Sequence, residues 1–118
     1  SGNENLVKYL IELGADVKKL NSNGETPLFM ACKNGNENLV KYLVKIGVDV
    51  KKLNKYGETP LFDACYSGNV NLVKYLVENG KRNEKIIKYL GEQGVDVNEG
   101  NDWAETPLHD ACNNEKQR

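Results

Sequence analysis

The sequence is poor in the residue types from which most catalytic and metal sites are built. Its 118 residues include one histidine, His109, one tryptophan, Trp103, and three cysteines. We find no Ser/His/Asp arrangement, no glycine-rich phosphate loop and no Cys/His cluster with metal-ligand spacing. The sequence therefore predicts a protein that is not an enzyme and that holds neither a metal nor a cofactor.

Long apolar runs and a strong net charge are also missing. No apolar segment approaches the ~20 residues that a membrane-spanning helix needs, and the formal net charge is −1. We therefore expect no membrane insertion and no general attraction to nucleic acid. The odd number of cysteines and the lack of an Asn-x-Ser/Thr acceptor site favour an intracellular, cytoplasmic protein.

What the chain does contain is a repeated nine-residue segment. Residues 24–32, GETPLFMAC, recur as GETPLFDAC at 57–65 and as AETPLHDAC at 104–112. Thr26 and Thr59 are 33 residues apart, a period typical of stacked helical solenoids. Each Thr-Pro pair predicts the start of a short helix, with the threonine hydroxyl as its cap and proline at its first position.

Longer amphipathic helices are expected over residues 3–13, 36–46 and 69–79, each ended by a following glycine. Gly24 and Gly57 are expected to hold positive φ in the turns before the short helices. Cys32, Cys65 and Cys112 share one position of the short helix. Stacked helices lie about 8–10 Å apart, which is too far for a disulfide, so we expect buried, free thiols at all three.

The full pattern is Gly-x-Thr-Pro-Leu-x-x-Ala followed by Gly-Asn-x-x-Leu-Val-Lys-Tyr-Leu-x-x-x-Gly-x-Asp-Val. It resembles the ankyrin repeat over nearly the whole chain. The resemblance implies an all-α solenoid of stacked helix-turn-helix units with short β-hairpin-like turns. It divides the chain into one domain, 1–118, made of a partial repeat 1–20, repeats 21–53 and 54–80, an irregular half-repeat 81–100 and a partial repeat 101–118.

Two positions depart from the family pattern. Phe29 and Phe62 stand where the family prefers histidine, and only His109 keeps it. The resemblance implies that this histidine hydrogen-bonds between neighbouring turns. Ala104 replaces the turn glycine, so the last turn is expected to be strained by about 1 kcal/mol or to adopt another shape.

A larger irregularity follows Gly80. Thr59 and Thr106 are 47 residues apart, which is 19 short of two periods of 33, and residues 83–90 repeat the longer helix only 14 residues after it began at Asn69. Three interpretations stay open: 19 residues are absent, one helix is displaced as an insertion, or Gly80–Arg82 crosses the stack. We favour the first.

Tyrosines and lysines form parallel ladders on the longer helices. The tyrosines are Tyr9, Tyr42, Tyr75 and Tyr89, and a lysine precedes each of them. Aromatic ladders can stack nucleic-acid bases, but packing between helices explains this one better. The lysine row is interpreted as a solvated face, because glutamates at 4, 37 and 84 neutralise most of it.

The positions that vary between modules predict the binding surface, which in the resembled family lies on the turn tips and the exposed side of the short helices. The candidate partner-binding residues are Asn23, Met30, Lys33, Lys55, Tyr56, Asp63, Tyr66, Asp102, Trp103 and Asp110. Trp103, Tyr56 and Tyr66 are the expected anchors, since Trp and Tyr dominate interface hot spots. Packing of Trp103 over the irregular junction is an equal alternative.

The charge on this predicted surface is lopsided. Six acids oppose two lysines, a balance of −4: Glu25, Glu58, Asp63, Asp102, Glu105 and Asp110 against Lys33 and Lys55. A partner segment with basic and aromatic residues therefore fits better than nucleic acid, which needs cationic side chains. The function predicted is a non-catalytic protein–protein interaction module, with a structural spacer or regulatory array in a longer parent protein as the alternative.

The two ends are half-modules. The chain begins with a longer helix that lacks its short partner and ends with a short helix that lacks its longer one, and neither carries the polar outer face of a terminal cap. We expect an excerpt of a longer array. The unpaired halves could also complement one another between copies in head-to-tail association.

Overall fold

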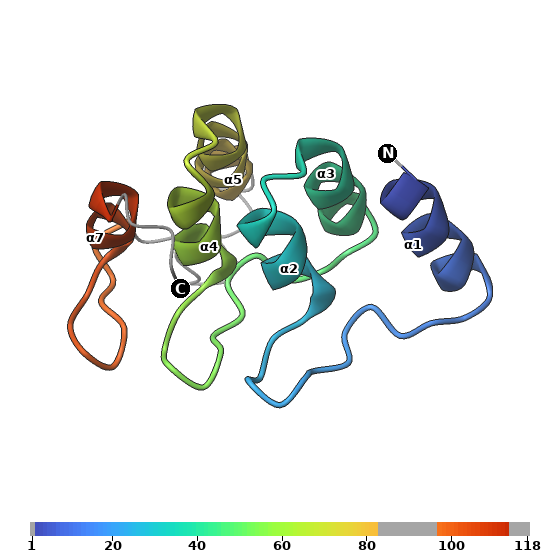
Figure 1. The fold of residues 1–118 in the computed structure, drawn as a ribbon, viewed down its shortest axis with the longest axis horizontal. Helices are drawn as coiled ribbons and strands as arrows, with labels where there is room; N and C mark the ends of the chain where they lie inside the picture. Colours follow the sequence, from blue (N-terminus) through green and yellow to red (C-terminus); the bar gives the residue numbers. More distant parts are fainter. Residues whose placement is uncertain (1, 83–96, 114–118) are drawn as a thin grey trace.

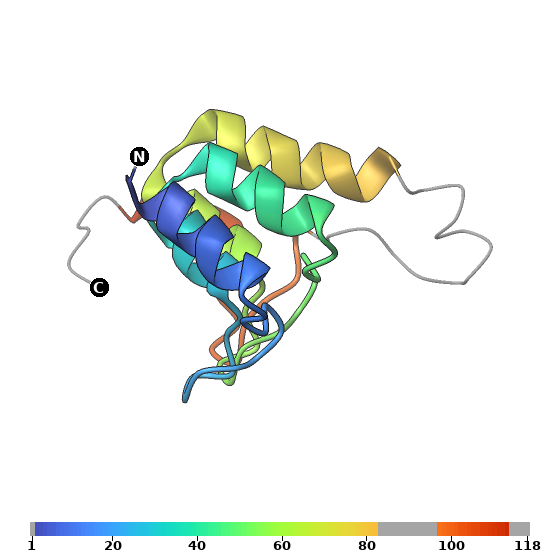
Figure 2. The ribbon, with the colours of Figure 1, turned by 90° about the vertical axis from the view of Figure 1, so that its right-hand side faces the viewer.

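Six helices in two layers make up the part of the chain that the computed structural model describes, residues 2–82 and 97–113. The short helices α2 (Pro27–Lys33), α4 (Pro60–Ser67) and α7 (Pro107–Cys112) lie side by side, and α1 (Gly2–Glu12), α3 (Glu37–Lys45) and α5 (Val70–Arg82) form the other layer (Figure 1). Loops before each short helix project away from both layers (Figure 2). Within these residues no strand occurs, which confirms the predicted all-α solenoid.

Each short helix starts at a Thr-Pro pair, but the threonine acts differently from the prediction. Thr26 and Thr59 have extended backbones, and proline takes the first helical turn, where its missing N–H costs no hydrogen bond. Neither threonine side chain caps its helix. Extended backbone geometry and proline therefore begin these helices, and the predicted hydroxyl cap is wrong at both positions.

Helices α3 and α5 are capped by asparagine, because its short side chain reaches the backbone N–H three residues ahead. Asn36 Oδ1 accepts from the Leu39 N–H at 3.2 Å, and Asn69 Oδ1 accepts from the Leu72 N–H at 3.1 Å. At the other end the prediction for Gly80 is wrong. Helix α5 continues through Gly80 to Arg82, so these three residues do not cross the stack.

The core runs continuously between the layers. The short helices contribute small and branched side chains, the longer helices contribute leucine and valine, and neighbouring modules share this cluster. Its members are Leu28, Ala31, Cys32, Leu39, Val40, Leu43, Val48, Leu61, Ala64, Leu72 and Leu76. Each Å² of apolar surface removed from water stabilises the fold by about 25 cal/mol, so this shared core is the main source of stability.

The third module stacks directly on the second. Helix α7 packs on α4 as α4 packs on α2. The spacing of 47 residues between Thr59 and Thr106 exceeds the period of 33 by 14. The preference for 19 absent residues and the alternative of a displaced helix both stay predictions, because residues 83–96 lie outside the described part of the chain. The predicted helix at 83–90 lies outside the described residues, as do Tyr89 and Lys88.

Candidate functional site

Three turns precede the short helices, and one asparagine organises each of them. Asn54 Oδ1 accepts from the N–H groups of Tyr56 and Glu58 at 2.9 and 3.0 Å. Asn21 and Asn101 bind the amides two and four residues ahead in the same way. Because the asparagine side chain replaces a backbone partner, it holds the turn in one shape.

Neighbouring turns are joined by a backbone bond and a side-chain bond. The Lys55 N–H donates to the Asn23 carbonyl at 2.9 Å, and the Asn54 Nδ2 donates to the Glu25 Oε2 at 2.9 Å. The next pair of turns repeats both bonds. There the Asp102 N–H donates to the Tyr56 carbonyl at 2.9 Å, and Asn101 Nδ2 donates to Glu58 Oε2 at 2.6 Å.

These links correct the predicted acidic surface. Glu25 and Glu58 are buried, because each carboxylate accepts the asparagine hydrogen bond that joins its turn to the next one. Asp63 and Asp110 are buried as well. Of the six acids only Asp102 and Glu105 remain exposed, opposite the exposed Lys33 and Lys55. The balance is therefore zero, and the expected charge of −4 is wrong.

An aromatic pair stands on the second and third turn tips. The ring centroids of Tyr56 and Trp103 are 5.4 Å apart and the planes are tilted by 31°. Lys55 Nζ lies 5.2 Å from the Tyr56 centroid. The side chain of Trp103 remains 64% exposed. The turn-to-turn backbone bond fixes the spacing of this pair, since both residues occupy the same position of their turns.

A hollow of about 340 Å³ lies beside this pair. It is formed by the last two turns and α7, and it combines aromatic rings with carboxylates. Its lining residues are Tyr56, Glu58, Trp103, Glu105, Asp110 and Asn113. The hollow can take a side chain that is apolar along its length and cationic at its end.

The ten predicted site residues divide by exposure. Met30, Lys33, Lys55, Asp102 and Trp103 are exposed, and Asn23 and Tyr56 are half-buried. Asp63, Tyr66 and Asp110 are buried, with 8, 9 and 7% of their surface exposed. Their predicted place on the open side of the short helices is therefore wrong.

The asparagine–glutamate links are the feature that sequence reasoning missed. Every module carries Asn three residues before the turn Gly or Ala and Glu immediately after it, as NSNGE, NKYGE and NDWAE. This recurrence could have predicted the contact between turns. A pair that never varies in an otherwise variable turn indicates a structural contact and not a site of recognition.

His109 makes local contacts, contrary to the bond between turns that the resemblance implied. Its Nδ1 accepts from the Thr106 N–H at 2.9 Å and lies 2.9 Å from the Thr106 hydroxyl oxygen. Phe29 cannot make this contact at the equivalent place in the first module. Accordingly, the Thr26 hydroxyl is buried without a hydrogen-bond partner.

The contacts agree with the predicted packing at Tyr42 and Tyr75, whereas Tyr9 is 58% exposed. Lys8 Nζ lies 5.1 Å from the Tyr42 centroid, and Lys41 Nζ lies 5.6 Å from the Tyr75 centroid. Each lysine thus contacts the ring on the next helix of the longer layer. These cation–π contacts replace the simple solvated face expected from the sequence.

The cysteines are free, but they are not equally buried. Burial, with a smaller contribution from Asp63, raises the pKa of Cys32 far above its ordinary value. Burial, followed by the Asp110 carboxylate, raises the pKa of Cys65 to about 11. Cys112 is exposed, so its predicted burial is wrong.

The described part of the chain lacks two other kinds of feature. Residues 2–82 and 97–113 contain no group of three His, Cys, Asp or Glu side chains that could hold a metal ion. Among the helices over those same residues, none combines the length and the apolar character needed to cross a membrane.

A family model described as ankyrin repeats (3 copies) matches residues 1–84, which is 84 of the 118 residues. No curated protein matches the chain. The match includes α1 to α5 and the first two turns, whose stacking pattern the third turn and α7 continue.

Proposed function

The chain belongs to the ankyrin repeat family, and from this we infer that it is a non-catalytic module that binds another protein through the turn face around Tyr56 and Trp103. Ankyrin repeats are generally protein–protein interaction modules. Residues 2–82 and 97–113 present a stacked scaffold with regular turns. Stacked repeats of this type bind through the extended surface that their turns and short helices form.

The aromatic pair carries the proposal. An indole that is 64% exposed leaves a large apolar surface in water, although its edge already contacts Tyr56. Backbone bonds between the turns hold both rings in position before any partner arrives. Little conformational entropy is then lost on binding, so such a pair is suited to be an interface hot spot.

The hollow beside the pair suggests the chemistry of the partner. Glu105 lies on its exposed side, and the Trp103 ring forms an apolar wall. A lysine or arginine of the partner can lay its aliphatic stem on the indole and direct its charge to the carboxylate. We therefore propose an extended partner segment with a basic residue and a neighbouring aromatic residue. Met30, Asn23 and Lys33 extend the same face toward the first module.

A structural spacer is the second candidate. The asparagine–glutamate links are buried and join consecutive turns, which makes the stack rigid enough to position another domain of a longer parent protein. A spacer does not need an exposed aromatic pair. The intracellular, cytoplasmic location predicted from the cysteines stays a prediction.

A peptide selection separates the two candidates. A randomised twelve-residue display library is selected on the immobilised chain, and each selected peptide is titrated against it. Trp103 is the single tryptophan, so its fluorescence reports binding at the proposed site directly. We expect selected peptides rich in Arg or Lys next to an aromatic residue.

Variants then locate the binding. Tyr56→Ala should weaken the selected peptides at least tenfold, whereas Tyr9→Ala should change the Kd by less than twofold, because Tyr9 is an exposed tyrosine on α1. Equal thermal unfolding of both variants shows that the scaffold is intact. A library that yields no binder, or binders indifferent to Tyr56→Ala, supports the spacer.

A further inference from the structure

We propose that the partner segment carries an acidic residue that faces Lys55, in addition to the basic residue at Trp103, so that it lies across the turns in one direction only. The inference deepens the proposed function and rests on it, because it names the charges that the turn face around Tyr56 recognises. Two opposite charges that the structure places on the second turn carry the argument.

Lys55 lies on the middle one of the three described turns. Its N–H donates to the Asn23 carbonyl of the first turn at 2.9 Å, and the carbonyl of the adjacent Tyr56 accepts from the Asp102 N–H of the third turn at 2.9 Å. The second turn therefore has a bonded turn on each side, and Lys55 is exposed nevertheless. Its exposure is a property of the stack and does not depend on where the chain begins or ends.

The side chain of Lys55 holds a positive charge next to the aromatic pair. Its Nζ lies 5.2 Å from the Tyr56 centroid, and the same ring lies 5.4 Å from the Trp103 ring. A cation–π contact orients the ammonium group but does not neutralise it. A basic partner residue that approached Tyr56 would therefore meet a like charge, whereas an acidic residue would be attracted.

Asp102 places the opposite charge against the same turn. It directly precedes Trp103 and is exposed, and a Cβ added to Gly57 would lie 2.6 Å from the Asp102 Oδ1. The carboxylate of Asp102 therefore lies close to the backbone of Gly57, the residue that follows Tyr56. The second turn thus has an ammonium group on its aromatic ring and a carboxylate against its glycine.

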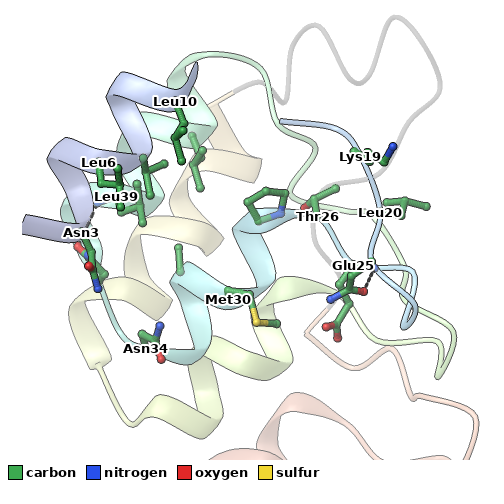
Figure 3. Close-up of a pocket in the computed structure, with 16 residues that line it drawn as sticks. Asn3, Leu6, Leu10, Lys19, Leu20, Glu25, Thr26, Met30, Asn34 and Leu39 are labelled. Carbon is green, nitrogen blue, oxygen red and sulfur yellow. Dashed lines mark hydrogen bonds between the residues drawn. The ribbon is translucent and has the colours of Figure 1, made fainter. Parts of the chain in front are cut away.

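The first turn adds no charge at the equivalent position. Ser22 stands there, where the next two turns have Lys55 and Asp102. Glu25 of the first turn is buried, because its amide is bonded within the turn (Figure 3) and its carboxylate accepts from Asn54 Nδ2 at 2.9 Å. From the first turn to the third, this position is therefore neutral, then positive, then negative.

An extended segment laid along the turn tips can satisfy both charges at once. Side chains on one face of such a segment are two residues apart, about 7 Å, and two ring contacts of 5.2 and 5.4 Å connect the Lys55 ammonium with Trp103. An acidic residue at Lys55 and a basic residue on Trp103 therefore fit with one residue between them. Reversing the segment would bring each charge next to a like charge, which lowers affinity and fixes the direction.

Parallel selections test the acidic residue. The randomised twelve-residue display library is selected on the unmodified chain, on Lys55→Glu and on Lys45→Glu. Lys45 is an exposed lysine at the end of α3, so Lys45→Glu is a control with the same change in net charge. On the unmodified chain and on the control we expect Asp or Glu two residues from the basic residue. On Lys55→Glu we expect Lys or Arg at that position instead.

Titration of one selected peptide, followed by the fluorescence of Trp103, measures the size of the effect. Changing the acidic residue of the peptide to glutamine should weaken its binding to the unmodified chain by about two- to fivefold, the range of an exposed ion pair. The same change should leave the Kd for Lys55→Gln unaltered. Raising the salt concentration should reduce the difference on the unmodified chain, because exposed charges are screened.

The outcomes separate this inference from the proposed function. Binders that need Tyr56 and carry the basic residue, but lack the acidic one or keep it on Lys55→Glu, overturn the inference alone. A library without binders, or with binders indifferent to Tyr56→Ala, overturns both. Loss of the acidic preference on Lys45→Glu as well would reduce it to an effect of net charge. Lys55 joins the turns through its backbone N–H, so its variants should give the circular dichroism of the unmodified chain, and Lys55→Gln repeats the comparison without an introduced charge.

Discussion

The third turn carries a backbone strain that a single substitution should relieve. Ala104 has φ 63°, in the left-handed region, where the first two turns have Gly24 at 74° and Gly57 at 76°. Ala104 N–H donates to the Asn101 carbonyl at 2.9 Å, as the two glycines donate in their turns. The last turn thus keeps the common shape, and alanine adopts a conformation that glycine tolerates better. We predict that Ala104→Gly stabilises this module.

The expected magnitude follows from two opposing effects. Left-handed backbone costs a residue with a Cβ about 1–2 kcal/mol. Glycine lowers the stability by about 0.4–1 kcal/mol, because the unfolded chain gains freedom. The difference is a gain of about 0.5–1 kcal/mol in the free energy of unfolding.

The equivalent glycines supply the reverse experiment. Gly24→Ala and Gly57→Ala impose the strain that Ala104 now carries, so each should lower the free energy of unfolding by about 1 kcal/mol. A Cβ at Gly24 would lie 3.3 Å from the Lys55 amide nitrogen, and one at Gly57 would lie 2.6 Å from Asp102 Oδ1. The second requires the Asp102 side chain to move.

Urea unfolding followed by two probes measures these changes. Trp103 is adjacent to Ala104 and is the single tryptophan, so its fluorescence reports the third turn, while circular dichroism reports all helices. Ala104→Gly should move the fluorescence midpoint upward by at least as much as the dichroism midpoint, because terminal modules open first. An unchanged or lowered fluorescence midpoint would refute the reasoning.

Two further predictions concern single buried groups. Thr26→Val should raise the free energy of unfolding by about 1 kcal/mol, because the buried hydroxyl has no hydrogen-bond partner. Thr59→Val is the control and should not show this gain. A lower free energy of unfolding for Thr26→Val, measured with urea, would contradict the prediction. With Ellman's reagent at pH 8, Cys112 should react first. Cys65 should react slowly, with a rate that rises about tenfold per pH unit toward its pKa of about 11, and Cys32 should react at the rate of unfolding. Equal rates for the three thiols would contradict their unequal burial.

The features that the sequence predicted correctly are those set by local backbone chemistry. The period between Thr26 and Thr59 located the modules, and positive φ at Gly24 and Gly57 followed from the need for a left-handed turn. None of these features depends on what lies beyond the next few residues.

Some errors are local, since Thr26 and Thr59 do not cap their helices and α5 continues through Gly80. Most of the others concern contacts between modules. Burial of Glu25 and Glu58 depends on an asparagine in the following turn, which is 29 residues ahead of Glu25 and 43 residues ahead of Glu58. The packing of α7 on α4 joins two modules whose threonines are 47 residues apart, where the regular period is 33. In a repeat with a constant period every module carries the same types of residue. The sequence alone therefore does not show which module supplies the partner of a given side chain, because the stacking of the modules determines it.

The division between constant and variable turn positions supports the proposed binding face more strongly than the overall charge did. The constant asparagine and glutamate are structural, since Asn54 binds Glu25 and Asn101 binds Glu58 between neighbouring turns. The residue that precedes the turn Gly or Ala is free to vary, and it is Asn23, Tyr56 and then Trp103. Backbone bonds place these three side chains in one row along the turn tips. Because the links fix the row independently of its side chains, partner preference can change at these positions without loss of the stack, and the apolar end of the row at Tyr56 and Trp103 is where affinity should be concentrated.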